Sequence, residues 1–379
     1  MIAKGKHMGS GLLSWLTAAT SLIVAAGLVL VLGVVLARKA ASWKIRRDEG
    51  VLAYDDTTIT FKRTPESAHP GTFVVHFPNG AAQVGDIVDS DGRRVTRTII
   101  RQRGSLAGVR TVRWEGETHF SPDEMGVHSE ITINGPLGPC PAWQFGPDGA
   151  DTWSIHIHGI RADRHNAMRS VPVTSAEGHT SLVVSYRGDA DTTAARGRAA
   201  SLGTTEWADV DAAVKYAVAH GAERVFLFGW SMGASIALLV AERSAARDAV
   251  AGLVLISPAS DWRGIIAHGA ARRRLPATAG LLGHLMLSNR ALSQLAGLTT
   301  PANFQELDWT IPGRLSIPTL VIHSPGDRTV PFSITKKFVE AGGDRVTLYT
   351  APDADHSWEY NVDPDGFDAA IGSWLTTVA

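Results

Sequence analysis

One stretch of ten residues constrains this chain more than any other. Residues Phe226 to Ser235 join a short apolar run, typical of a β-strand, to an Ala- and Leu-rich run typical of a helix. The junction carries the pattern G-x-S-x-G at Gly229, Ser231 and Gly233. Glycine on both sides of the serine permits a sharp turn, because side chains there would crowd the strand and the helix. The pattern predicts a strand–turn–helix unit that holds the Ser231 hydroxyl out at the end of a sheet.

The same alternation extends through the carboxy-terminal part of the chain. From about residue 152 onward, apolar runs of strand length alternate with helix-like segments. This order predicts an α/β domain with a mostly parallel sheet and helices on both faces. The predicted strands are Trp153–His158, Ser181–Tyr186, Arg224–Phe228, Leu253–Ile256, Thr319–His323 and Val346–Tyr349, and the predicted helices are Glu206–Ala219, Met232–Arg243 and Phe332–Ala341.

One long segment interrupts this alternation. Residues from about 260 to 310 show no clear strand but are rich in leucine and alanine, and they include the arginine run Arg272–Arg274. An insertion between two strands of an open α/β sheet lies above their carboxyl ends, where such sheets bind ligands. We predict a helical cap over this segment, and a long surface excursion is the alternative.

The amino-terminal segment is apolar enough to cross a membrane. No charged residue occurs from Met8 to Ala37. A helix over residues 12–37 would be about 39 Å long at ~1.5 Å per residue, enough for a hydrocarbon core of ~30 Å. A cleaved signal peptide would have a shorter apolar core and a small-residue cleavage site, whereas Arg38 and Lys39 follow this run directly. We predict a tail (1–11), a single-pass transmembrane helix (12–37) and a basic juxtamembrane linker (38–50).

Charge and cysteine content indicate where the chain resides. More basic residues follow the apolar run than precede it. This bias favours a cytoplasmic carboxy-terminal part. The single cysteine, Cys140, allows no disulfide within the chain and is compatible with a reducing compartment. The formal net charge of −1 argues against a nucleic-acid partner held by bulk electrostatics. The basic residues are Lys4 and Lys6 before the run, and Arg38, Lys39, Lys44, Arg46 and Arg47 after it.

A separate β-rich region precedes the α/β domain. Short β-like runs occur at Thr72–His76, Arg94–Ile100 and Glu130–Ile133. Asn-Gly and Asp-Gly pairs, which favour tight hairpin turns, lie between such runs. We therefore predict a small β-rich region over residues 51–139 and the main domain over residues 140–379.

The order of these features resembles the α/β-hydrolase superfamily. The shared features are the strand with its His158-Gly159 turn, the G-x-S-x-G motif, the helical insertion, the Gly326-Asp327 turn and a late histidine, His356. More narrowly, the chain is similar to membrane-anchored bacterial α/β hydrolases of unassigned substrate, which have a β-rich segment before the hydrolase domain. The resemblance covers roughly residues 140–379. It implies a nucleophile, a base and an acid on loops after the strands, an oxyanion hole, and no metal or organic cofactor.

Three residues match the reactive groups of that superfamily. Ser231 matches the nucleophile, and a serine hydroxyl requires an adjacent base to accept its proton. His356 follows the last predicted strand and matches the base. Asp327 follows the preceding strand and matches the acid that orients the imidazole and stabilises its charged form. Asp261 is the alternative acid, and a turn aspartate or loop histidine without chemistry is the structural alternative for the other two.

The oxyanion hole is expected from main-chain N–H groups. One belongs to Met232, which directly follows the nucleophile. The second belongs to Ile160, with Gly159 as the alternative donor. The His-Gly turn here differs from the His-Gly-Gly-Gly form of many lipases and esterases, so their substrates do not transfer to this chain. We expect His158, Gly159 and Trp230 to shape the substrate pocket.

A metal site is not expected from the histidines near the first strand of the α/β domain. His156 and His158 alternate along that strand, and His165 follows. No aspartate or glutamate has the spacing of a further ligand, and a buried strand position with a His-Gly turn explains the pair.

The sequence therefore predicts a membrane-tethered serine hydrolase. It would cleave a carboxylic ester or thioester of a small-molecule or lipid-like acyl substrate through an acyl-enzyme. A serine peptidase or acyltransferase using the same three residues is the first alternative. A catalytically silent membrane-anchored binding module is the second.

Overall fold

A computed structural model gives the structure of the chain. It describes residues 48–192 and 200–378, together with residues 15, 20, 21, 27, 31–35, 37, 38 and 41 of the amino-terminal segment. Most of the predicted transmembrane helix at 12–37 therefore lies outside the described residues. Among the residues that are described, no helix has the length and apolar character to span a membrane.

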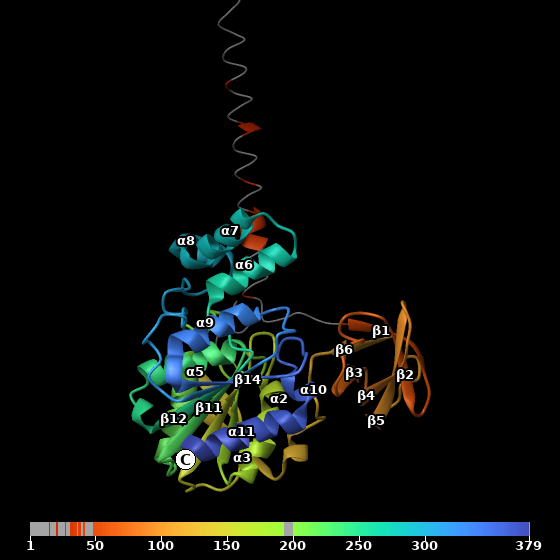
Figure 1. Ribbon diagram of the computed structural model, residues 1–379, viewed down its shortest axis with the longest axis horizontal. Helices are drawn as coiled ribbons and strands as arrows, with labels where there is room; N and C mark the ends of the chain where they lie inside the picture. The colour runs from red at the N-terminus through yellow and green to blue at the C-terminus, as the bar shows by residue number, and fades with distance from the viewer. Residues whose placement is uncertain are drawn as a thin grey trace, which may run out of the picture.

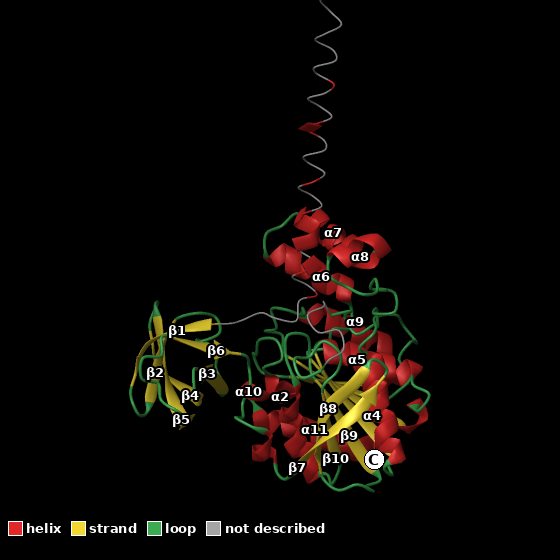
Figure 2. Ribbon diagram, turned by 180° about the vertical axis from the view of Figure 1, so that it is seen from behind, coloured by secondary structure: helices red, strands yellow, loops and turns green. Residues whose placement is uncertain are grey.

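The β-rich region forms a closed six-stranded barrel beside the α/β domain, next to α2 and α10 (Figures 1 and 2). Neighbouring strands pair in the order β1-β2-β5-β4-β3-β6. Closure leaves no strand edge open to pair with another chain. The Asn79-Gly80 and Asp91-Gly92 turns predicted from the sequence connect β3 to β4 and β4 to β5. The strands are β1 (Asp48–Tyr54), β2 (Thr58–Lys62), β3 (Phe73–Phe77), β4 (Gly80–Ser90), β5 (Arg94–Arg103) and β6 (Thr111–Trp114).

The α/β domain is built on an eight-stranded sheet. Its strand order is β14-β13-β12-β11-β9-β10-β8-β7, with parallel pairing from β14 to β10 and antiparallel pairing of β10 with β8 and of β8 with β7. The predicted α/β architecture with an amino-terminal β-rich region is thus confirmed. The strands are β7 (His128–Gly135), β8 (Gly138–Phe145), β9 (Thr152–Ile157), β10 (Thr180–Val184), β11 (Arg224–Trp230), β12 (Val250–Ile256), β13 (Thr319–His323) and β14 (Val346–Thr350).

One strand that the sequence places in the β-rich region belongs instead to the large sheet of the α/β domain. Glu130–Ile133 was assigned to the β-rich region, but these residues belong to β7 and pair with β8 along its whole length. The short connection at Pro136-Leu137 makes β7 and β8 a hairpin, and β8 in turn pairs with β10. The hairpin therefore belongs to the large sheet, and the barrel ends with β6.

Helices cover both faces of the sheet (Figures 1 and 2). One face carries α4 (Trp207–Ala219), α5 (Met232–Arg243) and α9 (Phe332–Gly342), whose apolar side chains join the larger buried cluster. The opposite face carries α3 (Val171–Ala176) and α11 (Pro364–Val378), which join the second cluster. The described part of the domain has two further one-turn α-helices outside the cap, α2 (Arg164–Ala167) and α10 (Glu359–Val362). The described 3-10 helices are η1 (Pro122–Met125), η2 (Met168–Ser170), η3 (Arg247–Ala249) and η4 (Gly343–Arg345).

The segment that interrupts the alternation forms three helices above the sheet (Figure 1). They are α6 (Trp262–Arg272), α7 (Ala277–Ser288) and α8 (Arg290–Leu295), and they lie between β12 and β13 in the chain. Described residues of the amino-terminal segment contact this cap. Gly33 lies against Leu282 and Met286 of α7, and the Arg38 guanidinium donates a hydrogen bond to the carbonyl of Leu295.

Candidate active site

The turn after β11 has the sharp geometry that the sequence predicts. Ser231 has a φ of 54°, a left-handed conformation that non-glycine residues rarely adopt outside functional sites. A Cβ at Gly229 would lie 2.6 Å from the Cα of Ala234, and one at Gly233 would press on the carbonyl oxygen of Ile157. Only glycine fits at these two positions, so the strand, the turn and helix α5 pack closely around the serine.

The structure brings Ser231, His356 and Asp327 together in one chain of hydrogen bonds. The Ser231 Oγ lies 2.7 Å from His356 Nε2, and His356 Nδ1 lies 2.6 Å from Asp327 Oδ2. The three residues follow β11, β14 and β13, whose carboxyl ends meet at the same edge of the sheet. The imidazole can therefore accept the serine proton at one nitrogen while the carboxylate holds the other.

Asp327 is bound from four directions. Its Oδ1 accepts the N–H groups of Thr329 and Val330 at 2.7 and 2.9 Å, and its Oδ2 accepts hydrogen bonds from His356 and His323. Burial alone would raise the pKa of this carboxyl, but the two histidines and their hydrogen bonds outweigh it. The pKa of Asp327 is accordingly well below its usual range, so that the group is ionised.

His323 is a part of this network that the sequence analysis missed. It is fully buried at the end of β13, its Nε2 lies 2.9 Å from Asp327 Oδ2, and its Nδ1 lies 2.6 Å from the Thr335 hydroxyl. In the sequence, only its position four residues before Asp327 could have indicated a contact between the two side chains. The predicted set of Ser231, His356 and Asp327 did not include it. His323 donates to the same carboxylate oxygen as His356 and fixes the plane of that carboxylate.

The pKa of His356 is raised above its ordinary value. Burial lowers this pKa, but the charge of Asp327 and the hydrogen bond to it raise it by more. The imidazolium formed when His356 takes the serine proton is therefore stabilised by the ionised carboxylate beside it.

The two predicted oxyanion donors come from the residue after Ser231 and from the pocket wall. Met232 is the first residue of α5, where main-chain N–H groups have no acceptor within the helix. Ile160 lies on the loop after β9 and lines the same pocket as Ser231. Gly159 packs so closely on the serine that a Cβ there would lie 2.9 Å from the Ser231 Cβ.

Other predicted residues have different positions. His158 is fully buried and does not line the pocket; its Nε2 bonds the Asp189 carboxylate at 2.8 Å and its ring stacks on Tyr186. It therefore supports the loop rather than the substrate. Trp230 reaches the pocket lining but is 2% exposed. Asp261, the alternative acid, caps α6 by accepting the N–H of Gly264.

The histidines considered for a metal are bonded to other groups. His156 Nδ1 lies 2.8 Å from the Ser170 hydroxyl, and His165 pairs with Asp163. Over the ranges that the structure describes, no three His, Cys, Asp or Glu side chains are grouped so that they could hold a metal ion.

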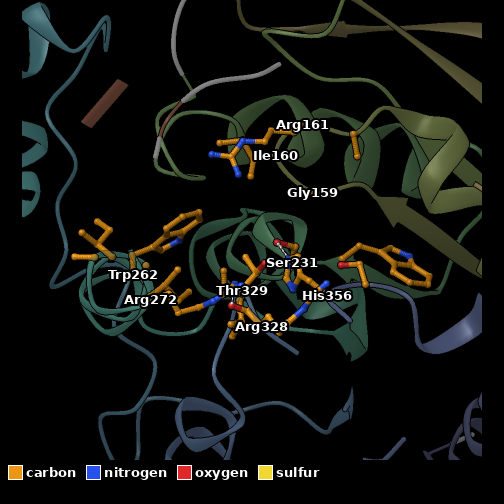
Figure 3. A pocket seen from close by; sticks show the side chains of 18 of the residues that line it. Gly159, Ile160, Arg161, Ser231, Trp262, Arg272, Arg328, Thr329 and His356 are labelled. Carbon is orange, nitrogen blue, oxygen red and sulfur yellow. Dashed lines mark hydrogen bonds between the residues drawn. The ribbon is translucent and has the colours of Figure 1, made fainter. Parts of the chain in front are cut away.

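Ser231 and His356 open into a pocket of about 500 Å³ between the sheet and the cap (Figure 3). Its walls come from the loop after β9, the loops after β13 and β14, and helices α6 and α7. Apolar residues of α6 and α7 form the wall of the pocket on the side of the cap. They are Ile265, Ile266, Ala270, Ala279, Gly283 and Leu287, and Ala37 of the amino-terminal segment joins them.

Comparison with known proteins agrees with this geometry. The profile of the alpha/beta hydrolase family matches residues 146–370. The chain belongs to this family. A second profile, described as a domain of unknown function, matches residues 50–115, which are the barrel. A search of curated proteins gives no match.

Solved structures share the fold of the hydrolase domain. An esterase from Pyrococcus furiosus in one crystal form is 21% identical, with a TM-score of 0.53 over 68% of this chain and 94% of that one. In a second crystal form the identity is 20% and the TM-score 0.51, over 68% of this chain and 96% of that one. A thermophilic esterase from Thermogutta terrifontis is 20% identical, with a TM-score of 0.45 over 66% and 99% of the two chains. At 20–21% identity, the likeness to the Pyrococcus furiosus esterase shows the fold.

The barrel contacts the loop that carries His356. Trp358 is 3% exposed and belongs to the apolar core of the barrel. Its ring lies 5.1 Å from the ring of His69, whose Nε2 accepts the N–H of Asp355 at 3.0 Å. The residues on both sides of His356 are thus fixed by barrel residues.

A buried arginine, Arg169, also connects the barrel to the loop that carries His356. Arg169 is 2% exposed and its guanidinium lies 4.1 Å from the Trp230 ring. It donates to the carbonyls of Ser357 and Gly116 and, at 2.6 Å, to the amide oxygen of Asn361. Burial lowers the pKa of Arg169 to about 10, which leaves it charged at neutral pH. One cation therefore joins the end of β6 to the histidine loop and to α10.

Proposed function

We propose that this chain is a serine hydrolase that cleaves a carboxylic ester or thioester through an acyl-enzyme. The observation that carries the proposal is the unbroken hydrogen-bond chain from Ser231 through His356 to Asp327, open to a pocket with an apolar wall. The α/β-hydrolase family of the chain supports it.

The reaction follows from the positions of these groups. Ser231 Oγ attacks the acyl carbonyl while His356 Nε2 takes its proton, and Asp327 stabilises the imidazolium. The N–H groups of Met232 and Ile160 receive the negative charge that develops on the carbonyl oxygen. His356 then gives its proton to the leaving oxygen or sulfur. A water molecule, deprotonated by His356, releases the acyl group and restores the serine.

We also propose that a membrane helix at residues 12–37 tethers the enzyme, with the hydrolase domain in the cytoplasm. The uncharged run and the basic residues after it support this proposal. The packing of Gly33 and Arg38 on the cap would place the pocket close to the lipid surface. Protease protection of the full chain in sealed vesicles measures the orientation. Cleavage of the hydrolase domain only by protease on the non-cytoplasmic side would contradict the proposed orientation.

Labelling of the full chain with a fluorophosphonate tests the serine chemistry. We expect stoichiometric labelling that disappears in Ser231→Ala, and hydrolysis of acyl esters and thioesters that disappears with it. A folded wild-type chain that does not react would favour a silent binding module. Cleavage of amides in preference to esters, or acyl transfer to an added acceptor in preference to water, would assign the same residues to a peptidase or an acyltransferase.

A further inference from the structure

The pocket is apolar at one end and cationic around the serine. Among the residues that the structure describes, five arginines line it, and Glu115 is the one acidic residue in that lining. Arg272 and Arg328 lie next to each other in the pocket wall, and Arg161 lies across the pocket from Ser231 (Figure 3). The five arginines are Arg161, Arg169, Arg272, Arg273 and Arg328.

Three of these arginines come from separate elements that line the same pocket as Ser231. Arg161 directly follows Ile160 and has a φ of 69°, so the chain accepts an unfavourable backbone conformation at this point of the pocket wall. Arg272 lies in the last turn of α6. Arg328 directly follows Asp327 on the loop after β13. No single surface helix accounts for this grouping.

Arg328 and Arg272 have different kinds of partner. Arg328 pairs with the Asp355 carboxylate, and its side chain is 37% exposed. Arg272 donates to the main-chain carbonyl of Arg328, a neutral acceptor. Glu115 pairs with Arg113, which lies outside the lining. The described lining therefore carries more cationic than acidic side chains, and the ionised Asp327 behind His356 adds one further negative charge.

We infer that the pocket takes an acyl ester with an anionic oxygen group, a phosphate or carboxylate, close to the scissile bond. This inference rests on the proposed function. Guanidinium groups bind such oxygens with paired, charge-assisted hydrogen bonds. The aliphatic chain of the same substrate lies between α6 and α7, against Ile265, Ile266 and Leu287. Arg161, Arg272 and Arg328 set the specificity for the anionic group.

Esters that differ only in this group test the inference. The full-length chain in neutral detergent is given decanoylglycerol phosphate, decanoyl lactate and uncharged decanoylglycerol. We expect kcat/KM to be at least about tenfold higher for one or both anionic esters, because hydrogen bonds to charged groups are among the stronger ones. The preferred anion identifies the group. Equal or faster hydrolysis of decanoylglycerol overturns the inference.

A substitution locates the preference. Arg272→Gln keeps hydrogen-bonding capacity and removes the charge, so the ratio of anionic to neutral kcat/KM falls several-fold, mainly through KM. Arg274→Gln removes the same charge two residues away, on an exposed side chain outside the lining, and leaves the ratio as in the wild type. Equal ratios in wild type and Arg272→Gln, or equal losses in the two variants, contradict the assignment.

Protection of Ser231 separates this inference from the proposed function. Decyl phosphate should slow fluorophosphonate labelling at concentrations at least about tenfold below those required of decanol, and Arg272→Gln should remove that difference. A chain that hydrolyses none of the esters but shows this protection loses the proposed function and keeps the anionic site. Equal protection by decyl phosphate and decanol, with ester hydrolysis intact, overturns the site alone.

Discussion

The indole of Trp358 packs edge-on against the ring of Phe73, with 4.8 Å between the ring centroids and 69° between the ring planes. Phe73 begins β3 of the barrel, whereas Trp358 lies two residues after His356. The core of the barrel and the loop of the proposed base are therefore one packed unit. The barrel is then a structural part of the candidate active site and not only a separate domain before it in the chain.

Trp358→Ala should lower activity through the position of His356. Removal of a buried tryptophan costs about 3–5 kcal/mol of unfolding free energy, and the freed loop should lower kcat roughly 10- to 100-fold with a smaller change in KM. Trp374→Ala is the matched control, because Trp374 is 5% exposed on α11, away from the pocket. Denaturant unfolding and ester kinetics measure the two effects. Equal kcat losses in both variants would contradict a specific role of the barrel.

Arg169→Met should uncouple the same parts by another route. The methionine fills similar space but leaves the carbonyl of Ser357 and the amide oxygen of Asn361 without this donor, whereas the Gly116 carbonyl still accepts from Asn361 Nδ2. Buried acceptors without partners cost about 1–3 kcal/mol each, so we expect a loss of about 2–4 kcal/mol in unfolding free energy. Chemical denaturation measures it, and a loss below about 1 kcal/mol would mean that water replaces the arginine.

Activity should fall on the acid side with the titration of His356. The residue acts as a base only when neutral, and its pKa is raised because Asp327 outweighs the effect of burial. The rate constant kcat/KM is therefore lost as pH falls through an apparent pKa above the ordinary histidine value of about 6.5. A pH profile of ester hydrolysis checks this. An acid limb below the ordinary value would contradict the proposed coupling.

Asp327→Asn should remove that coupling and most of the activity. The amide cannot stabilise the imidazolium, so kcat should fall by roughly 10³- to 10⁴-fold, as the loss of the acid does in other serine triads. Asp261→Asn, on the alternative acid, is the control, and its kcat should stay within about threefold of the wild type, because Asp261 caps α6 and does not bond His356. The reverse result would move the acid to the loop after β12.

His323→Gln should produce a smaller change than Asp327→Asn. The glutamine has an N–H to offer Asp327, but it loses the rigid ring that bridges Asp327 and Thr335. We expect a decrease in kcat of about tenfold, comparable with the weakening of a single charge-assisted hydrogen bond. Single-turnover acylation by an activated ester measures the chemical step, and an unchanged rate would show that the main-chain donors to Asp327 are sufficient.

Local patterns predicted much of the fold and the central residues of the site. The strand–turn–helix unit around Ser231 follows from the glycines beside it, and the apolar runs that become β9 to β14 are continuous in the sequence. Asp327 and His356 could be placed because each follows a recognisable strand. Trp358, Arg169 and His323 could not, because their roles depend on which distant segments pack against them. The sequence also places the strand at Glu130–Ile133 in the β-rich region rather than in the large sheet, because local sequence does not specify its pairing partner.

The barrel core takes Ala354 and Trp358 from near the carboxyl end of the chain. His69 and Asp355, which bond across the same junction, are 286 positions apart. During synthesis on the ribosome, the six barrel strands therefore emerge long before the residues that complete their interior. Contacts between such distant positions form late, because a long loop must close first. The histidine loop and the barrel thus reach their final packing together, only after Trp358 has been synthesised, and the candidate site is incomplete until then.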